Sequence, residues 1–129
     1  MYRILLVDDE KMELEALKNY IDWKTLGIDH VDTAKNGKAA YELVLDRQPD
    51  IVITDIQMPV MNGYEATANI RAGESDYWKT IPVIAMTANV FQEDESRAAE
   101  CGMSDYVTKP IDMNVIYSVL EKWLRGQKG

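Results

Sequence analysis

Several apolar segments of this chain end in residues whose side chains can hold a cation or a phosphoryl group. The residues at these ends are Asp8 with Asp9, Asp55, Thr87 and Lys109. Carboxylates held close together repel one another unless a cation lies between them. All-oxygen ligation with no His or Cys nearby favours Mg2+. We expect Asp9 and Asp55 to be direct ligands, Asp8 to act through a coordinated water, and the backbone carbonyl of Gln57 to supply another oxygen.

Lys109 and Thr87 would add a positive charge and a hydroxyl donor to such a site. A Lys ammonium is a good point-charge partner for phosphate, and Pro110 restricts Lys109 to extended conformations. The small Ala88 leaves room for a phosphoryl group beside Thr87. Each residue alone also has an ordinary structural interpretation, and Asp55 alone could equally cap the following helix.

The elements that would position these residues alternate along the chain. Apolar runs predict strands at 2–7, 29–34, 51–53, 82–86 and 105–108. Apolar residues at helical spacing predict helices at 11–23, 38–46, 64–72 and 92–101, and a last helix capped by Asp112. Asp9 is the expected cap of the first helix. We expect residues 74–81 to form a polar loop whose Tyr77 and Trp78 pack inward or contact a partner.

This order predicts an α/β fold, (βα)5, with a doubly wound five-stranded parallel sheet and helices on both faces. The flavodoxin-like strand order 2-1-3-4-5 is the one we expect. In that order the carboxyl ends of the first, third, fourth and fifth strands are contiguous. The acidic ends of strands one and three then flank the point where the strand order reverses, which is where such sheets bind ligands.

Length and charge limit the classes of protein to consider. The 129 residues suffice for one domain, which we expect to span 1–129. The 14 basic and 22 acidic residues give a net charge of −8, which repels phosphate backbones and anionic lipid. The chain has no run apolar enough to span a membrane and no signal-peptide pattern. We therefore expect a cytoplasmic protein without direct contact to nucleic acid or membrane.

Taken together, the motifs resemble those of response-regulator receiver domains of two-component signalling, over essentially the whole chain. The matching segments are Asp8-Asp9 after an apolar strand, Asp55-Ile-Gln-Met-Pro with Asn62-Gly63 behind it, Met86-Thr-Ala88, and Tyr106-Val-Thr-Lys-Pro110. The resemblance implies that Asp55 is the phosphoacceptor and forms a magnesium pocket with Asp8 and Asp9. It also implies that Thr87 and Lys109 contact the phosphoryl group and that the Lys109–Pro110 bond is cis.

The resemblance further implies a phosphorylation switch. Asp55 would take a phosphoryl group from a phosphohistidine of a sensor histidine kinase or a histidine phosphotransfer domain. Thr87 would turn toward that group and Tyr106 would follow, which changes the surface formed by the fourth helix (92–101), the fifth strand and the fifth helix. The fourth helix has few apolar residues to bury, so it should move easily. A half-buried sheet aromatic is an equally good interpretation of Tyr106.

Gln57 and Asn89, together with Ala88, are expected to tune the lifetime of the phosphoryl group rather than the identity of the protein. We expect a signalling switch with self-catalysed phosphoryl transfer and slow autodephosphorylation, not an enzyme. Homodimerisation through the switch surface is a further expectation, as is an effector domain or hybrid kinase in the same polypeptide.

Three alternatives stay open. A magnesium-dependent phosphatase with an aspartate nucleophile, of the haloacid dehalogenase type, normally needs a second acid where Gln57 stands. A nucleotide-binding module would need a Gly-rich loop in place of Asp8 and Asp9. A pseudo-receiver would act through protein contacts alone.

Overall fold

The computed structural model describes residues 2–55, 63–73, 76–87, 100, 102–108 and 112–126. These residues form a five-stranded parallel sheet with the strand order β2-β1-β3-β4-β5, which confirms the predicted order. The strands are β1 (Tyr2–Val7), β2 (Ile28–Ala34), β3 (Ile51–Asp55), β4 (Val83–Thr87) and β5 (Asp105–Thr108). The helix predicted at 92–101 lies outside the described residues except for Glu100.

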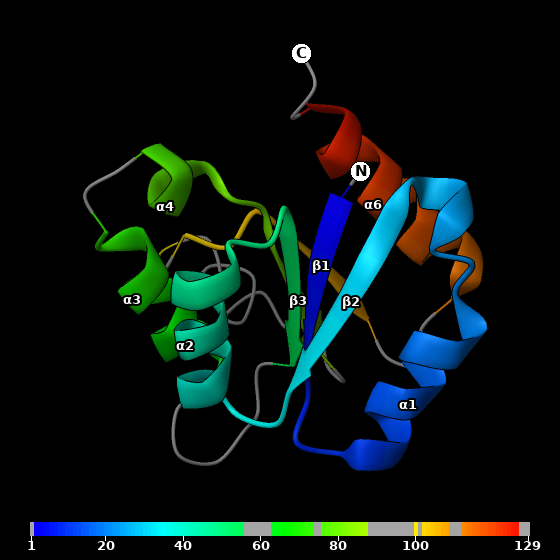
Figure 1. Ribbon diagram of the computed structural model, residues 1–129, viewed down its shortest axis with the longest axis horizontal. Helices are drawn as coiled ribbons and strands as arrows, with labels where there is room; N and C mark the ends of the chain where they lie inside the picture. Colours follow the sequence, from blue (N-terminus) through cyan, green and yellow to red (C-terminus); the bar gives the residue numbers. More distant parts are fainter. Residues whose placement is uncertain are drawn as a thin grey trace.

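Helices cover both faces of the sheet (Figure 1). On one face lie α1 (Lys11–Tyr20) and α6 (Met113–Gly126), and on the other lie α2 (Gly37–Arg47) and α3 (Gly63–Arg71). The inner strands are apolar throughout because alternate side chains pack into the two separate cores. In β1, for example, Ile4 and Leu6 belong to one core and Leu5 and Val7 to the other.

The last helix has the predicted amphipathic pattern. Ile116, Leu120 and Leu124 are buried, and Asp112 accepts backbone hydrogen bonds at its amino end, from Asn114 at 2.8 Å among others. The predicted apolar face and the predicted cap of α6 are therefore both confirmed. No helix in the described part of the chain is long and apolar enough to cross a membrane.

The first helix ends earlier than the predicted residue 23. Its C-cap, Ile21, is extended, with φ −88° and ψ 133°. Asp22 then accepts hydrogen bonds from the backbone N–H and the hydroxyl of Thr25, and a short 3-10 helix, η1 (Lys24–Leu26), follows. The turn formed by the Asp22 side chain thus takes the place of further backbone hydrogen bonds of α1. Gly27, at φ 78°, closes η1 in the left-handed region that favours glycine.

The polar loop predicted at 74–81 is wrong, because the chain forms a further short helix there, α4 (Asp76–Thr80). Tyr77 and Trp78 are partly buried against the core that contains Leu5 and Val7. The centres of their rings are 4.7 Å apart in a T-shaped arrangement. The Tyr77 hydroxyl donates a 2.6 Å hydrogen bond to the Pro49 carbonyl. The expectation that these two aromatic residues pack inward is therefore the one that the structure bears out.

Candidate functional site

The register of the sheet brings Asp8 and Asp55 to the same edge. Val7 pairs with Thr54, so Asp8, just beyond β1, lies beside Asp55 at the end of β3. Asp55 itself pairs with Met86 of β4. Asp55 is the last residue of β3, and the first described residue of α3 is Gly63.

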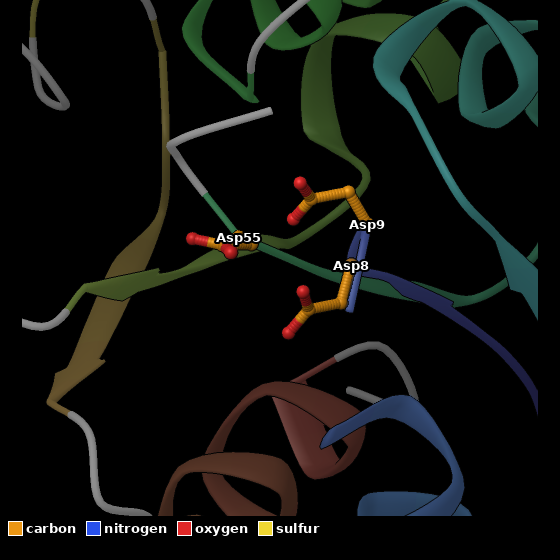
Figure 2. Close-up of side chains that lie close together, drawn as sticks. All are labelled: Asp8, Asp9 and Asp55. Atoms are coloured by element: carbon orange, nitrogen blue, oxygen red, sulfur yellow. The ribbon is translucent and has the colours of Figure 1, made fainter. Parts of the chain in front are cut away.

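Three carboxylates gather at this edge (Figure 2). One side-chain oxygen each from Asp8, Asp9 and Asp55 lies within 4.8 Å of the other two. Figure 2 shows the side chains coming from the ends of two neighbouring strands, with their carboxylates turned to the same side. Asp8 is completely buried and Asp55 is 7% exposed, whereas Asp9 is exposed. Three oxygen donors in one small, partly open cluster fit a hard divalent cation such as Mg2+.

Asp8 accepts a backbone hydrogen bond just before α1, the helix that the sequence analysis expected Asp9 to cap. The backbone N–H of Glu10 donates to Asp8 Oδ1 at 2.9 Å, while the N-cap position of α1 is Glu10, which makes no side-chain cap bond. The prediction that Asp9 caps α1 is therefore wrong. An Asp that accepts from the N–H two residues later is a common local turn, and this spacing in the sequence could have indicated it.

Thr54 is a buried residue that the sequence analysis did not consider. Its hydroxyl donates to the backbone carbonyl of Asp55 at 3.0 Å. Asp8 is also fixed through its backbone, since its N–H donates to the Ala34 carbonyl at 3.1 Å. Both strand ends are thus held by hydrogen bonds as well as by the sheet. Nothing in the sequence distinguishes Thr54 from an ordinary strand threonine.

The other predicted site residues are only partly described. Thr87 is the last residue of β4 and pairs with Thr108 at the end of β5, at the same edge as Asp55. The Thr87 side chain lies outside the described part of the structure, as do the following whole residues: Gln57, Ala88, Asn89, Lys109 and Pro110. Their predicted functions stay predictions.

Tyr106, the predicted switch residue, belongs to β5 and pairs with Ala85. Its side chain is 39% exposed, and its backbone N–H donates to Asp105 Oδ1 at 2.8 Å. This exposure fits a half-buried sheet aromatic as well as a switch residue, so both interpretations of Tyr106 stay open.

The strand order and the acidic cluster agree with a comparison of the sequence with protein families, in which one family model matches most of the chain. The family model of the response regulator receiver domain matches residues 4–121. The chain belongs to this family. The receiver domain is 35% identical over 122 residues to the uncharacterised transcriptional regulatory protein YesN of Bacillus subtilis, covering 95% of this chain and 32% of that protein. It is 34% identical over 122 residues to sensor protein GacS of Pseudomonas syringae pv. syringae, covering 94% of this chain and 13% of that protein.

A solved structure supports the same assignment. The receiver domain of sensor histidine kinase PA1611 from Pseudomonas aeruginosa is 30% identical, with a TM-score of 0.82, and the match covers 95% of this chain and 97% of that one. That structure has a magnesium ion coordinated in its active site cleft. The present receiver domain spans a third or less of the length of YesN and GacS.

Proposed function

We propose that this receiver domain is the phosphoacceptor switch of a two-component phosphorelay, with Asp55 as the acceptor. The observation that carries the proposal is the cluster of three carboxylates, in which Asp55 ends a buried strand beside Asp8 and Asp9. A carboxylate at this edge of an open α/β sheet is where such folds bind ligands.

In the proposed reaction a carboxylate oxygen of Asp55 attacks the phosphorus of a phosphohistidine. The new bond joins that oxygen to phosphorus, the phosphorus–nitrogen bond breaks, and the histidine ring leaves with the electron pair. Asp8, Asp9 and Asp55 hold Mg2+ together with the Gln57 carbonyl, and the bound ion supplies positive charge that neutralises the phosphoryl oxygens. The fit of three carboxylate oxygens to this ion supports the assignment.

Lys109 and Thr87 complete the proposed site by contacting the phosphoryl group. Thr87 follows Met86, the strand partner of Asp55, and this position supports its assignment. The hydroxyl of Thr87 and then the ring of Tyr106 rearrange, and the surface of the 92–101 segment, β5 and α6 changes with them. To reverse a 1:99 equilibrium, the phosphoryl group must favour the active form by about 5.5 kcal/mol, which a few charge-assisted hydrogen bonds supply.

The proposed phosphodonor is a sensor histidine kinase or a histidine phosphotransfer domain. A kinase or effector domain in the same polypeptide is also proposed, because the receiver domain spans only part of YesN and GacS. We further propose that the switch surface forms a homodimer, and that the domain counts as a signalling switch and not as an enzyme.

The test is the intact mass of the protein after incubation with acetyl phosphate, with Mg2+ or with EDTA. The wild type should gain one phosphoryl group only with Mg2+, and Asp55→Asn should gain none. Asp46→Asn is the matched control, because Asp46 is an exposed aspartate on α2 that should leave phosphorylation unchanged.

An unmodified wild type in the presence of bound Mg2+ would overturn the phosphoacceptor assignment and favour a pseudo-receiver. Rapid release of inorganic phosphate without a stable acyl phosphate would instead favour the phosphatase alternative.

A further inference from the structure

An apolar groove of about 660 Å³ lies beside β2, at the end of the sheet opposite to the acidic cluster. Ile28, at the start of β2, pairs with Tyr2 at the start of β1, whereas Asp8 follows the end of β1. The groove is lined by Ile21, Trp23, Ile28 and Val31 among others. Ile21 and Ile28 are buried, while Trp23 and Val31 are partly exposed. Apolar side chains are thus accessible beside the sheet.

The strand next to this groove is an edge strand. Among the described strands, β2 has a neighbour on one side only, and Figure 1 shows it at the border of the sheet. The Ala34 carbonyl accepts its hydrogen bond from Asp8, on the side of β1. Because backbone groups alternate in direction along a strand, those of Val31 and Thr33 point to the other side. Val31 therefore offers its side chain to the groove and its backbone to the open edge.

The charges beside the groove favour one kind of occupant. Asp22 and Asp29, both exposed, line the groove with a single ammonium group, that of Lys24. The whole chain carries a net charge of −8. Hydrogen bonds from Thr25, first from its hydroxyl, lower the pKa of Asp22, which keeps that carboxylate ionised. A second copy of this acidic edge would be repelled, whereas a basic segment would be attracted.

We propose that the groove and the edge of β2 together bind an extended segment of a partner protein in which apolar and basic residues alternate. The segment adds a strand beside β2 through backbone hydrogen bonds to Val31 and Thr33. One of its apolar side chains enters the groove against Trp23, and its basic side chains meet Asp22 and Asp29. Backbone pairing supplies affinity in such strand addition, and the side-chain groove supplies specificity.

This docking surface uses none of the residues proposed for the phosphorylation chemistry. The groove lies at the opposite end of the strands from Asp55, and Val31 and Thr33 pair with Ile4 and Leu6 of β1. Strand pairing is limited to the regular part of β2, since the register shifts between Tyr2 and Arg3 and leaves Asp29 without a partner residue in β1. An irregular, acidic edge of this kind resists pairing with identical chains, which is consistent with a partner of different charge.

The first experiment is a titration of the full chain with the synthetic peptide Lys-Ile-Arg-Val-Lys-Ile-Arg, followed by calorimetry and by amide hydrogen exchange. The peptide should bind, slow exchange at the amides of Val31 and Thr33 at least about tenfold, and shift the indole N–H resonance of Trp23. Binding should weaken as NaCl is raised, because part of the attraction is between exposed charges. A peptide with Glu at every basic position should not bind.

Three variants separate this mode of binding from general charge attraction. Thr33→Pro removes the outward backbone donor at a position where an edge strand tolerates proline, and should abolish binding. Thr33→Val keeps the donor and should bind as the wild type does. Asp29→Asn tests the charge alone and should weaken binding severalfold, which keeps the proposal testable if Thr33→Pro fails to fold. All three variants that fold should still be phosphorylated by acetyl phosphate.

The proposal is overturned if the basic peptide does not bind, if it leaves the Val31 and Thr33 amides unprotected, or if the acidic peptide binds equally well. It is also overturned if a folded Thr33→Pro or Asp29→Asn binds as tightly as the wild type. Sedimentation showing dimers that Thr33→Pro abolishes would make a second copy of the chain the occupant and would overturn the assignment to a basic partner.

Discussion

Replacing Asp8 by Asn should stabilise the metal-free protein and, at the same time, weaken its response to Mg2+. Asp8 is completely buried, and its carboxylate lies within 4.8 Å of those of Asp9 and Asp55. In the absence of a cation, these like charges oppose folding. Asn keeps nearly the same shape and retains an oxygen that can accept the hydrogen bond from the Glu10 backbone.

The magnitude follows from Coulomb's law. Two unit charges 4.8 Å apart repel one another by about 3.5 kcal/mol at an effective dielectric constant of 20, and by about 0.9 kcal/mol in bulk water. The bond from Glu10 weakens by about 1 kcal/mol when its acceptor loses its charge. We therefore expect Asp8→Asn to raise the free energy of unfolding by up to about 2.5 kcal/mol in EDTA, the value at the effective dielectric constant of 20.

Urea unfolding in EDTA and in MgCl2, at matched ionic strength, measures both effects. In the wild type, Mg2+ at ten times its dissociation constant should add about 1.4 kcal/mol to the free energy of unfolding. Asp8→Asn should lose most of that increment. Asp46→Asn is the control, since it removes one charge from an exposed position on α2 and should change stability by less than about 0.5 kcal/mol in either buffer.

Two results would refute this reasoning. If Asp8→Asn in EDTA is no more stable than Asp46→Asn, the three carboxylates do not repel one another appreciably in the folded state. If Mg2+ stabilises Asp8→Asn as much as it stabilises the wild type, Asp8 does not contribute to the cation site.

Three further substitutions test contacts that stabilise the fold. Tyr77→Phe should lower the free energy of unfolding by about 1 kcal/mol at pH 8, because the bond to the Pro49 carbonyl is lost. Burial, aided by the charge of Asp50, raises the pKa of Tyr77, so the contribution of its hydroxyl is complete below about pH 10 and is lost at higher pH. In urea unfolding from pH 8 to 11, the difference in free energy of unfolding between the wild type and Tyr77→Phe should shrink. Gly73→Ala should cost about 1–3 kcal/mol in the same assay, because a Cβ at this position would clash with the ring of Trp78. Asp112→Ala should cost about 1 kcal/mol through loss of the α6 cap.

Each of these three predictions would be contradicted by a specific result. A stability difference between Tyr77→Phe and wild type that does not change with pH would mean that the buried hydroxyl keeps an ordinary pKa. A fully stable Gly73→Ala would show that the neighbouring indole ring shifts without cost. An unchanged free energy of unfolding for Asp112→Ala would show that water satisfies the first backbone donors of α6 equally well.

Much of the site could be predicted from the sequence because strand ends in a parallel sheet are ordered by topology. Once the strands and their right-handed crossovers are given, few arrangements are allowed, and all of them bring Asp8 and Asp55 to one edge. The sequence did not separate the functions of Asp8 and Asp9, because both precede α1 and both can cap it. Which carboxylate accepts the Glu10 N–H depends on backbone directions fixed by the pairing of β1 with β2.

The apolar runs and helical spacings of the sequence by themselves determined the parallel sheet with helices on both faces and the amphipathic face of α6, since burial on both sides requires continuous apolar strands. The strand order 2-1-3-4-5 was expected by analogy with flavodoxin-like folds, and the structure confirms it. Only the tertiary structure decided that α1 ends at Tyr20, that residues 76–80 are helical, and that a groove accompanies β2. These features depend on contacts between distant parts of the chain. The Tyr77 hydroxyl bonds to Pro49, and the Tyr117 hydroxyl accepts from the backbone of Asp22 at 2.7 Å. Local propensity carries no information about such contacts, because the partner residue lies far away along the chain.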